Sequence, residues 1–259
     1  MKTLLCYLAL AGLSAGLLTA FPPPGGGSAR PGRRSNLTPP APPASGDACS
    51  SCTNETFEGT GYAVAGWTES LGGGIVNEDY TTAPAPILGS QSLLAKNVAF
   101  ASSFTEINLP NSTEGWMRFA LVLTNTAVTG WYVATFADSG GAAMARLSVQ
   151  GAKLRVECGA AITADTATSI VANKTNYIWF HYKKGTGVNA QADVGFAEHP
   201  TKTRPTGGGT YAQTLLGTST VNCQLFRLGG GDDDFVGAEA GGIYDNASLT
   251  TIGVIGDFP

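Results

Sequence analysis

The residues whose side chains are best suited to binding or catalysis lie in one short stretch, residues 176–184, which read NYIWFHYKK. If the stretch is a β-strand, its side chains point alternately to two faces, because the side-chain period of a strand is two. One face carries Ile178, Phe180 and Tyr182. The other carries Tyr177, Trp179, His181 and Lys183. The pattern predicts a strand that packs a core on one side and presents aromatic rings beside a titratable imidazole on the other.

Aromatic rings of this kind suit carbohydrate recognition, in which a flat apolar ring stacks on a sugar. Trp116 occupies the polar parity of its own alternating segment, as Trp179 does, so we expect both rings on a face open to a ligand. The candidate ligand-binding residues are Trp116, Trp179, His181 and Tyr211. The structural alternative stays open for each tryptophan, because large aromatic side chains also fill the cores and edges of sandwiches.

Catalytic groups of the familiar hydrolytic kinds are absent from the sequence. Glycoside hydrolysis requires two carboxylates that flank the sugar bond, and no run of alternating acidic residues supplies them. Glu78 and Asp79 are adjacent, so a strand sends them to opposite faces. Neither a Gly-x-Ser-x-Gly elbow nor the lysine of a phosphate-binding loop is present. We therefore expect that the protein is not an enzyme.

Calcium is the one cofactor that the sequence offers. This ion prefers carboxylate and carbonyl oxygens from flexible loops. The candidate ligands are Asp232, Asp233 and Asp234, which follow a glycine triplet, together with Asp245. The spacing matches no specific calcium loop, so a solvated acidic turn remains the alternative.

Four cysteines remain after Cys6, which lies in a predicted signal peptide. Cys49, Cys52, Cys158 and Cys223 form an even set, and in an exported chain such a set favours disulfides. Three connectivities are open, of which we favour Cys49–Cys52 with Cys158–Cys223. A zinc site is the weaker alternative, because only His181 and His199 are available to join the thiols and neither stands at ligand spacing.

The elements that must position these residues are short strands. Leu154, Val156 and Cys158 alternate with Lys153, Arg155 and Glu157, which is the clearest two-residue period. Further strands are predicted at 116–123, 131–136, 146–150, 178–182, 192–197, 223–228 and 242–249. Glycine-rich turns separate these strands. Many short strands between such turns predict an all-β sandwich or barrel.

The N-terminal part of the chain is not predicted to belong to that fold. Residues 1–20 combine an early lysine with an apolar run and small residues near a cleavage point, which is typical of a secretory signal peptide. Residues 21–46 hold eight of the fourteen prolines, which predicts an extended, disordered spacer. One domain at 47–259 follows. No later stretch reaches membrane-spanning length, so we expect a secreted or cell-surface protein.

The charge of the domain excludes one class of partner. Residues 47–259 hold 11 basic and 19 acidic side chains, a net charge of −8. Such a balance argues against binding to a phosphate backbone. We therefore expect no nucleic-acid partner.

Five stretches in a fixed order carry a resemblance to a known family. They are FEGTGY at 57–62 with Trp67, NEDY at 77–80 leading to GSQSL at 89–93, ADSGG at 137–141, residues 177–187 before VGF at 194–196, and GIYDN at 242–246. Together they resemble the LamG-like, concanavalin A-like lectin–glucanase jelly rolls of secreted bacterial proteins, over residues 55–257. The resemblance implies two antiparallel sheets packed as a jelly-roll sandwich. It implies architecture rather than activity, because this fold hosts many unrelated functions.

The combined pattern predicts a secreted, non-catalytic binding module that recognises carbohydrate or another extracellular surface ligand. Scattered aromatic residues favour this prediction. The alternative is a structural, assembly or surface-display module, which the proline-rich spacer favours. A glycoside hydrolase is disfavoured, because no paired carboxylates are present.

Overall fold

The structure is a computed structural model of the 259-residue chain. It describes residues 52–59, 61–71, 77–81, 87–97, 103–159, 163–186, 189–205, 212–217, 219–230 and 240–258. All of these lie within one compact unit, residues 40–259. The predicted signal peptide and the predicted spacer lie outside the described residues, so they stay predictions.

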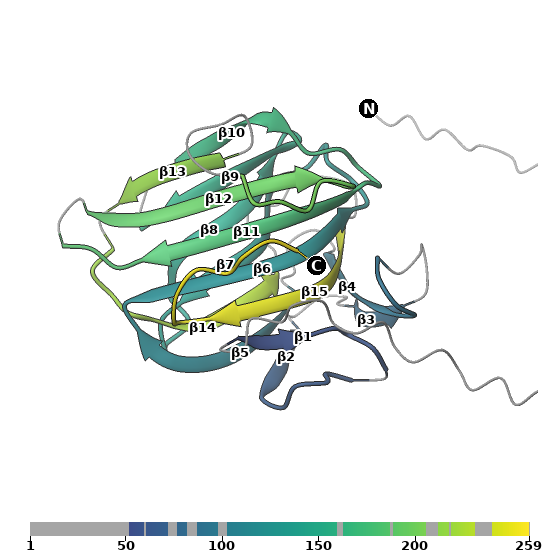
Figure 1. Cartoon of the computed structure of the whole chain (residues 1–259), viewed down its shortest axis with the longest axis horizontal. Coiled ribbons are helices and arrows are strands. Elements are labelled where there is room, and N and C mark those ends of the chain that lie inside the picture. The colour runs from purple at the N-terminus through teal and green to yellow at the C-terminus, as the bar shows by residue number, and fades with distance from the viewer. Residues whose placement is uncertain are drawn as a thin grey trace, which may run out of the picture. The chain divides into compact units, whose positions relative to one another are not determined.

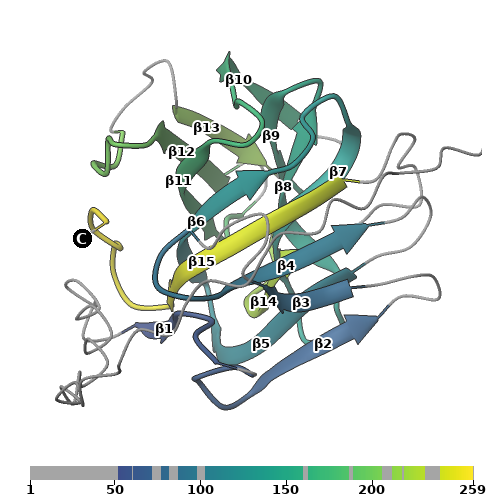
Figure 2. The ribbon, with the colours of Figure 1, turned by 90° about the vertical axis from the view of Figure 1, so that its right-hand side faces the viewer.

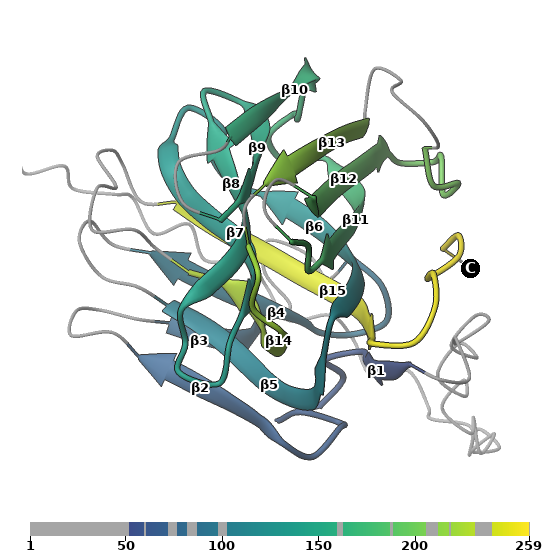
Figure 3. The same cartoon turned by 90° about the vertical axis from the view of Figure 1, so that its left-hand side faces the viewer.

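Two antiparallel sheets make up this unit, as the predicted jelly-roll sandwich requires (Figure 1). The front sheet runs in the order β13 (Ala212–Gly217), β12 (Ala190–Glu198), β11 (Thr175–Lys183), β6 (Glu114–Leu123), β15 (Ala240–Thr250), β4 (Ser92–Asn97) and β3 (Asn77–Thr81), and β1 (Thr53–Glu55) also pairs with β15. The back sheet runs in the order β10 (Thr163–Ser169), β9 (Lys153–Cys158), β8 (Ala143–Gln150), β7 (Thr129–Ala137), β14 (Cys223–Gly229), β5 (Ser103–Ser112) and β2 (Trp67–Leu71). Figures 2 and 3 show the two sheets as separate layers.

The described part of the chain contains strands, turns and bends but no helix. Accordingly, none of its segments is a helix long and apolar enough to cross a membrane. The strands expected at 131–136, 178–182, 192–197 and 223–228 lie inside β7, β11, β12 and β14. The alternating periods therefore located these elements correctly.

The core lies between the two sheets and uses one parity of each strand. Ile178, Phe180 and Tyr182 on β11 are fully buried, as their parity predicts. From the back sheet, Phe136 meets Phe180 at a ring-centroid distance of 4.9 Å and Tyr182 at 6.1 Å. The Tyr244 hydroxyl reaches across the same interior and donates to the Val133 carbonyl at 3.0 Å. Because these residues of β11 pack between the sheets, the alternate residues Tyr177, Trp179 and His181 lie on the outer face of the front sheet.

The predicted Cys158–Cys223 disulfide is not formed. Both thiols are free and buried in the core, on β9 and β14 respectively. Alternation shows correctly that each side chain points inward, but it does not show which inward side chains are neighbours. Burial raises the pKa of each thiol to about 11, so both are protonated at neutral pH. Cys49 lies outside the described residues, so the Cys49–Cys52 pairing stays a prediction.

Gly115 on β6 is a point where two rings of the back sheet approach the front sheet closely. A Cβ atom added there lies 2.8 Å from Phe136 Cε1 and 2.9 Å from Phe226 Cζ. We expect Gly115→Ala to lower the free energy of unfolding by about 1–3 kcal/mol, because the added methyl overpacks a filled core. Urea denaturation measures this change.

Gly61→Ala is the matched control, since an added Cβ meets nothing within 4 Å there. We expect it to change the free energy of unfolding by no more than about 0.5 kcal/mol. Equal stabilities for the two variants contradict the close packing described for Gly115.

Candidate functional site

Strand register places a row of aromatic and charged side chains on the outer face of the front sheet. β11 lies between β6 and β12, so each of its outer residues has two cross-strand neighbours. His181 lies opposite Trp116 and Asp193. Trp179 lies opposite Arg118 and Gly195, and Tyr177 lies opposite Ala120 and Ala197. We use the name front-sheet site for Trp116, Arg118, Tyr177, Trp179, His181 and His199.

The imidazole of His181 is held at both nitrogens by carboxylates. Its Nδ1 lies 2.7 Å from Asp193 Oδ2, and its Nε2 lies 2.9 Å from Glu114 Oε1. Both contacts are donor hydrogen bonds when the ring carries two N–H groups. The Trp116 ring stacks on this imidazole with centroids 3.7 Å apart. His181 is therefore fixed in orientation and, at 3% exposure, closed to solvent.

Tyr177 forms a second pair with a histidine, at the opposite end of the β11 row. Its hydroxyl lies 3.1 Å from Nδ1 of His199, which follows the end of β12. Burial raises the pKa of Tyr177 above its ordinary value, so the phenol keeps its proton at neutral pH. His199 is exposed and anchored through its backbone N–H, which donates to Thr175 O at 3.0 Å. A buried phenol and an accessible imidazole can therefore exchange a proton here.

Arg118 supplies a fixed positive charge between these two histidine pairs. Its Nη2 donates to Ser248 Oγ at 3.1 Å, and the side chain is only 2% exposed. Burial lowers the pKa of Arg118, while the nearby Asp257 charge opposes that shift. Among the residues that the structure describes, Arg118 Nε and Trp116 Nε1 are buried donors without an acceptor. Such donors are uncommon inside proteins, and the core tryptophans Trp67 and Trp131 have the same state.

The site is covered by the C-terminal end of the described chain. Residues 251–258 cross the outer face of the front sheet, in front of β6 and β11 in the view of Figure 1. Figures 2 and 3 place the same segment outside the sandwich. The cover explains why Tyr177 and Trp179 are each only 2% exposed although they point away from the core.

Three of the four predicted ligand-binding residues come together. Trp116, Trp179 and His181 share the outer face of neighbouring strands, as their parity indicates. Tyr211 lies outside the described residues. Arg118 and Tyr177 carry the same parity signal as their neighbours, so the sequence already placed them on this face without assigning them a role. Glu114 and Asp193 were missed, and His199 was considered only as a weak zinc ligand, because their contacts depend on how the strands pair.

The predicted calcium ligands are not brought together in the part of the chain that the structure describes. Asp232, Asp233 and Asp234 lie outside the described residues. The Asp245 carboxyl is 1% exposed and accepts hydrogen bonds from Leu88 N at 2.8 Å and Ser92 Oγ at 2.9 Å. No group of three or more His, Cys, Asp or Glu side chains within the described ranges could hold a metal ion. Calcium stays a prediction, and Asp245 has a structural role.

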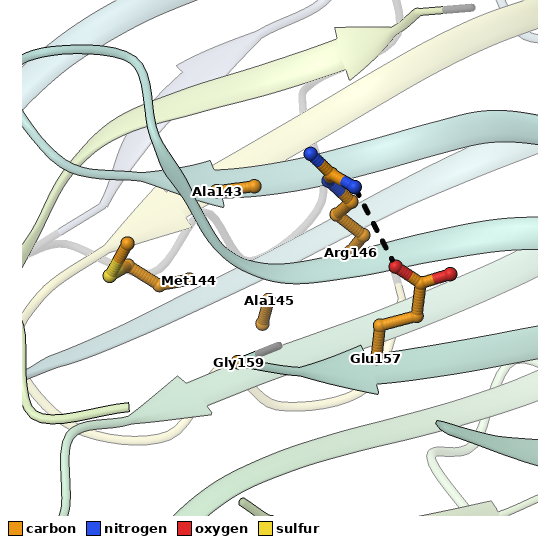
Figure 4. Close-up of a pocket in the computed structure, with 6 residues that line it drawn as sticks. All are labelled: Ala143, Met144, Ala145, Arg146, Glu157 and Gly159. Carbon is orange, nitrogen blue, oxygen red and sulfur yellow. Dashed lines mark ion pairs between the residues drawn. The ribbon is translucent and has the colours of Figure 1, made fainter. Parts of the chain in front are cut away.

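A pocket of about 270 Å³ lies on the back sheet, away from the front-sheet site (Figure 4). It is lined by Ala143, Met144, Ala145, Arg146, Glu157 and Gly159. Its one charged pair, Arg146 with Glu157, is separated by 3.9 Å and is partly exposed. This pocket is concave but has few polar or charged side chains, so the front-sheet site is the better candidate for a functional site.

Comparison with known proteins identifies the fold. No family model matches the sequence, and no curated protein matches it either. The structure is similar to that of the cellulose-induced protein Cip1, with 15% identity, a TM-score of 0.55 and coverage of 78% of this chain and 98% of that one. It is similar to an endo-β-1,4-glucuronan lyase from the fungus Trichoderma reesei, with 13% identity, a TM-score of 0.55 and coverage of 79% and 97%. It is also similar to a PL-14 alginate lyase from Aplysia kurodai, with 8% identity, a TM-score of 0.50 and coverage of 68% and 87%.

These similarities confirm the jelly-roll sandwich architecture. At such low identities they show a shared fold, and the finer LamG-like relationship is not confirmed.

The prediction that the protein is not an enzyme is contradicted by these comparisons, since two of the three structures named above are polysaccharide lyases. The prediction failed because it searched for the paired carboxylates of hydrolases. An elimination reaction needs a base, a proton donor and a group that stabilises developing negative charge. The lack of an acidic pair therefore does not argue against catalysis on this fold.

The buried carboxyl of Asp245 is expected to make the stability of the fold depend on pH. Burial raises its pKa to about 7, although the hydrogen bonds from Leu88, Ser92 and Asn246 favour the carboxylate. Because this value exceeds that of the unfolded chain, the folded protein holds a proton that the unfolded chain loses between about pH 4 and 7, so stability falls as pH rises through this window. Between about pH 5 and about pH 8 the free energy of unfolding of the unaltered chain should decrease. We expect this decrease to be smaller by roughly 1–3 kcal/mol in Asp245→Asn, because the amide does not titrate.

Urea unfolding at several pH values measures this difference. Glu69→Gln, at an exposed position of β2, is the control and should follow the unaltered chain. Parallel stability profiles for Asp245→Asn and the unaltered chain contradict the protonated state assigned to Asp245.

Proposed function

We propose that the protein is a polysaccharide lyase that acts on a uronic acid-containing polymer at the front-sheet site. The observation that carries this proposal is the Tyr177–His199 hydrogen bond of 3.1 Å, on the same sheet face as the buried cation of Arg118. Similar structures whose names include a glucuronan lyase and an alginate lyase support the substrate class. Export through the predicted signal peptide belongs to the same proposal, because such polymers are extracellular.

The chemistry of elimination matches the groups available. In the tautomer with its proton on Nδ1, His199 donates to the Tyr177 oxygen, which leaves Nε2 free as a base. Nε2 removes the proton at C5 of the uronate, the C4–O4 bond breaks, and a C4–C5 double bond forms. The Tyr177 hydroxyl gives its proton to the departing O4. The proton on Nδ1 then passes to the phenolate, and His199 keeps the one taken from C5.

Arg118 is suited to the charge that develops in this reaction. Removing the C5 proton places negative charge on the neighbouring carboxylate, and a fixed guanidinium stabilises that charge without reorganising. Arg118 and Tyr177 are diagonal neighbours across β6 and β11, because Trp179 lies opposite Arg118. A uronate between them is within reach of both, since diagonal pairs on neighbouring strands are about 7–8 Å apart.

The rest of the site provides binding. Trp179 offers a ring for stacking, and the buried N–H donors of Trp116 and Arg118 can meet sugar oxygens. Although the domain has a net charge of −8, the guanidinium of Arg204 lies 4.6 Å from the centre of the Trp116 ring, beside Arg118 on the same face. The positive charges at the site favour an anionic ligand in spite of the net negative charge of the domain, because charge interactions weaken with distance and are screened in salt.

Tyr177→Phe tests the proposed proton donor. We expect it to lower kcat on a susceptible polyuronate by roughly 100-fold or more, because a positioned acid or base contributes 10²–10⁴-fold. The assay is the ultraviolet absorbance of the new double bond conjugated to the carboxylate, measured on polyglucuronate and alginate.

Tyr132→Phe is the matched control, since Tyr132 lies on β7 of the back sheet and accepts a hydrogen bond from Arg146. It should keep the activity of the unaltered chain. Equal activity of Tyr177→Phe and the control contradicts the role of Tyr177. New reducing ends without a double bond indicate hydrolysis and contradict the reaction class.

A further inference from the structure

The front-sheet site already holds an occupant, which is the chain itself. We propose that residues 251–258 form an intramolecular plug, which a polysaccharide must displace before it reaches Arg118, Trp179 and Tyr177. The identity of the displacing ligand rests on the proposed function. The plug itself rests on contacts that do not depend on that proposal.

Backbone carbonyls of the plug take up the hydrogen-bond donors of the site. Arg118 Nη1 donates to Gly256 O at 3.3 Å and also to Asp257 O. Trp179 Nε1 donates to the same Gly256 oxygen at 2.9 Å. Two neighbouring carbonyl oxygens thus hold the indole and the guanidinium, which are donors that suit the oxygens of a sugar.

An aromatic ring of the plug occupies the stacking surface. The Phe258 ring lies 4.6 Å from that of Tyr177 and 5.2 Å from that of Trp179, and the Arg118 guanidinium lies 4.6 Å from its centre. Phe258 is only 6% exposed, so its ring fills the space above these side chains. No pyranose can stack on Trp179 while Phe258 is in this position.

The plug is also joined to the segment that follows β12. Phe258 N donates to Lys202 O at 3.0 Å, and Arg204 N donates to Asp257 Oδ1 at 2.7 Å. The same segment carries His199, the partner of Tyr177. Release of the plug therefore opens the site and also removes two hydrogen bonds of the segment that bears the proposed base, while His199 keeps its own bond to Thr175.

The hold on the plug is local, so it can open while the sandwich stays folded. Ile252 and Val254 are 72% and 61% exposed, and the segment forms no strand. Only Ile255 and Phe258 bury their side chains. Segments with few buried apolar contacts open at a small fraction of the free energy of global unfolding.

The contacts of the plug also describe the ligand that can replace it. The plug supplies two carbonyl oxygens and a flat ring, so the ligand must offer oxygen acceptors beside a flat apolar face.

Chemical modification of Arg118 tests the plug without any polysaccharide. Phenylglyoxal reacts with accessible guanidinium groups, and peptide mass spectrometry of the full chain locates the modified arginine. For Phe258→Ala we expect Arg118 to react roughly tenfold faster or more, because the ring loses the apolar burial that holds it in place. Arg155 on the back sheet is the internal reference, since its side chain is 33% exposed and pairs with Asp165.

Val254→Ala is the matched control in the same segment, because Val254 is largely exposed and should leave the rate at Arg118 unchanged. Asp257→Ala is a second test variant, which removes the acceptor of Arg204 N and should give a smaller increase. Equal rates at Arg118 in the unaltered chain and in both test variants overturn the plug. Circular dichroism and urea midpoints identify any variant that has lost its fold, and the second variant then decides.

Polyuronate binding separates this inference from the proposed function. We expect Phe258→Ala to bind polyglucuronate or alginate roughly tenfold more tightly than the unaltered chain, because the competing ring is gone. Faster modification of Arg118 without binding or cleavage of any polyuronate supports the plug and overturns the proposed function. Equal and measurable affinities of the unaltered chain and Phe258→Ala, together with equal rates at Arg118, overturn the plug and leave the proposed function standing.

Discussion

The pairing of β11 with β6 on one side and β12 on the other is the constraint on which the rest of the structure depends. A strand held between two neighbours has no freedom to slip, because a shift of one residue exchanges its two faces. With Phe180 and Tyr182 packed against Phe136, Trp179 and His181 must face outward. The register then decides which partners they meet, namely Arg118 and Trp116 on β6 and Asp193 on β12. One hydrophobic contact between the sheets thereby orders a polar row on the other side of the front sheet.

That polar row is costly unless it is satisfied, because charged groups removed from water need partners. The fold meets this requirement in two ways. His181 receives two carboxylates from adjacent strands, which makes it a fixed part of the sheet. Arg118 instead depends mainly on carbonyl oxygens of the C-terminal segment, together with Ser248. His181 therefore has a structural role in the sheet, whereas Arg118 can exchange its carbonyl partners for the oxygens of a ligand.

Much of this arrangement follows from two-residue periods in the sequence. The parity of Ile178 and Phe180 identified the core face, and that of Trp116 and Trp179 identified the outer face. Periods do not report neighbours across the sheet, so the Tyr177–His199 contact, 22 residues apart, was not foreseen. For the same reason Cys158 and Cys223 were wrongly paired. The C-terminal segment has no period at all, and its contact with Arg118 spans more than a hundred residues of chain. The enzyme prediction failed differently, because a search for hydrolase carboxylates does not detect other reaction chemistry.

The two buried thiols have a consequence for how the sandwich is held together. Because Cys158 and Cys223 are free, no disulfide joins β9 to β14, and that region is held by side-chain packing and by the backbone hydrogen bonds that run through β8 and β7. Their pKa values of about 11 leave almost no thiolate at neutral pH, so oxidants and alkylating reagents have little to attack while the fold is intact. Unfolding removes that protection from both at once. The pair therefore makes a native sensor of global opening, readable by thiol labelling without any introduced probe.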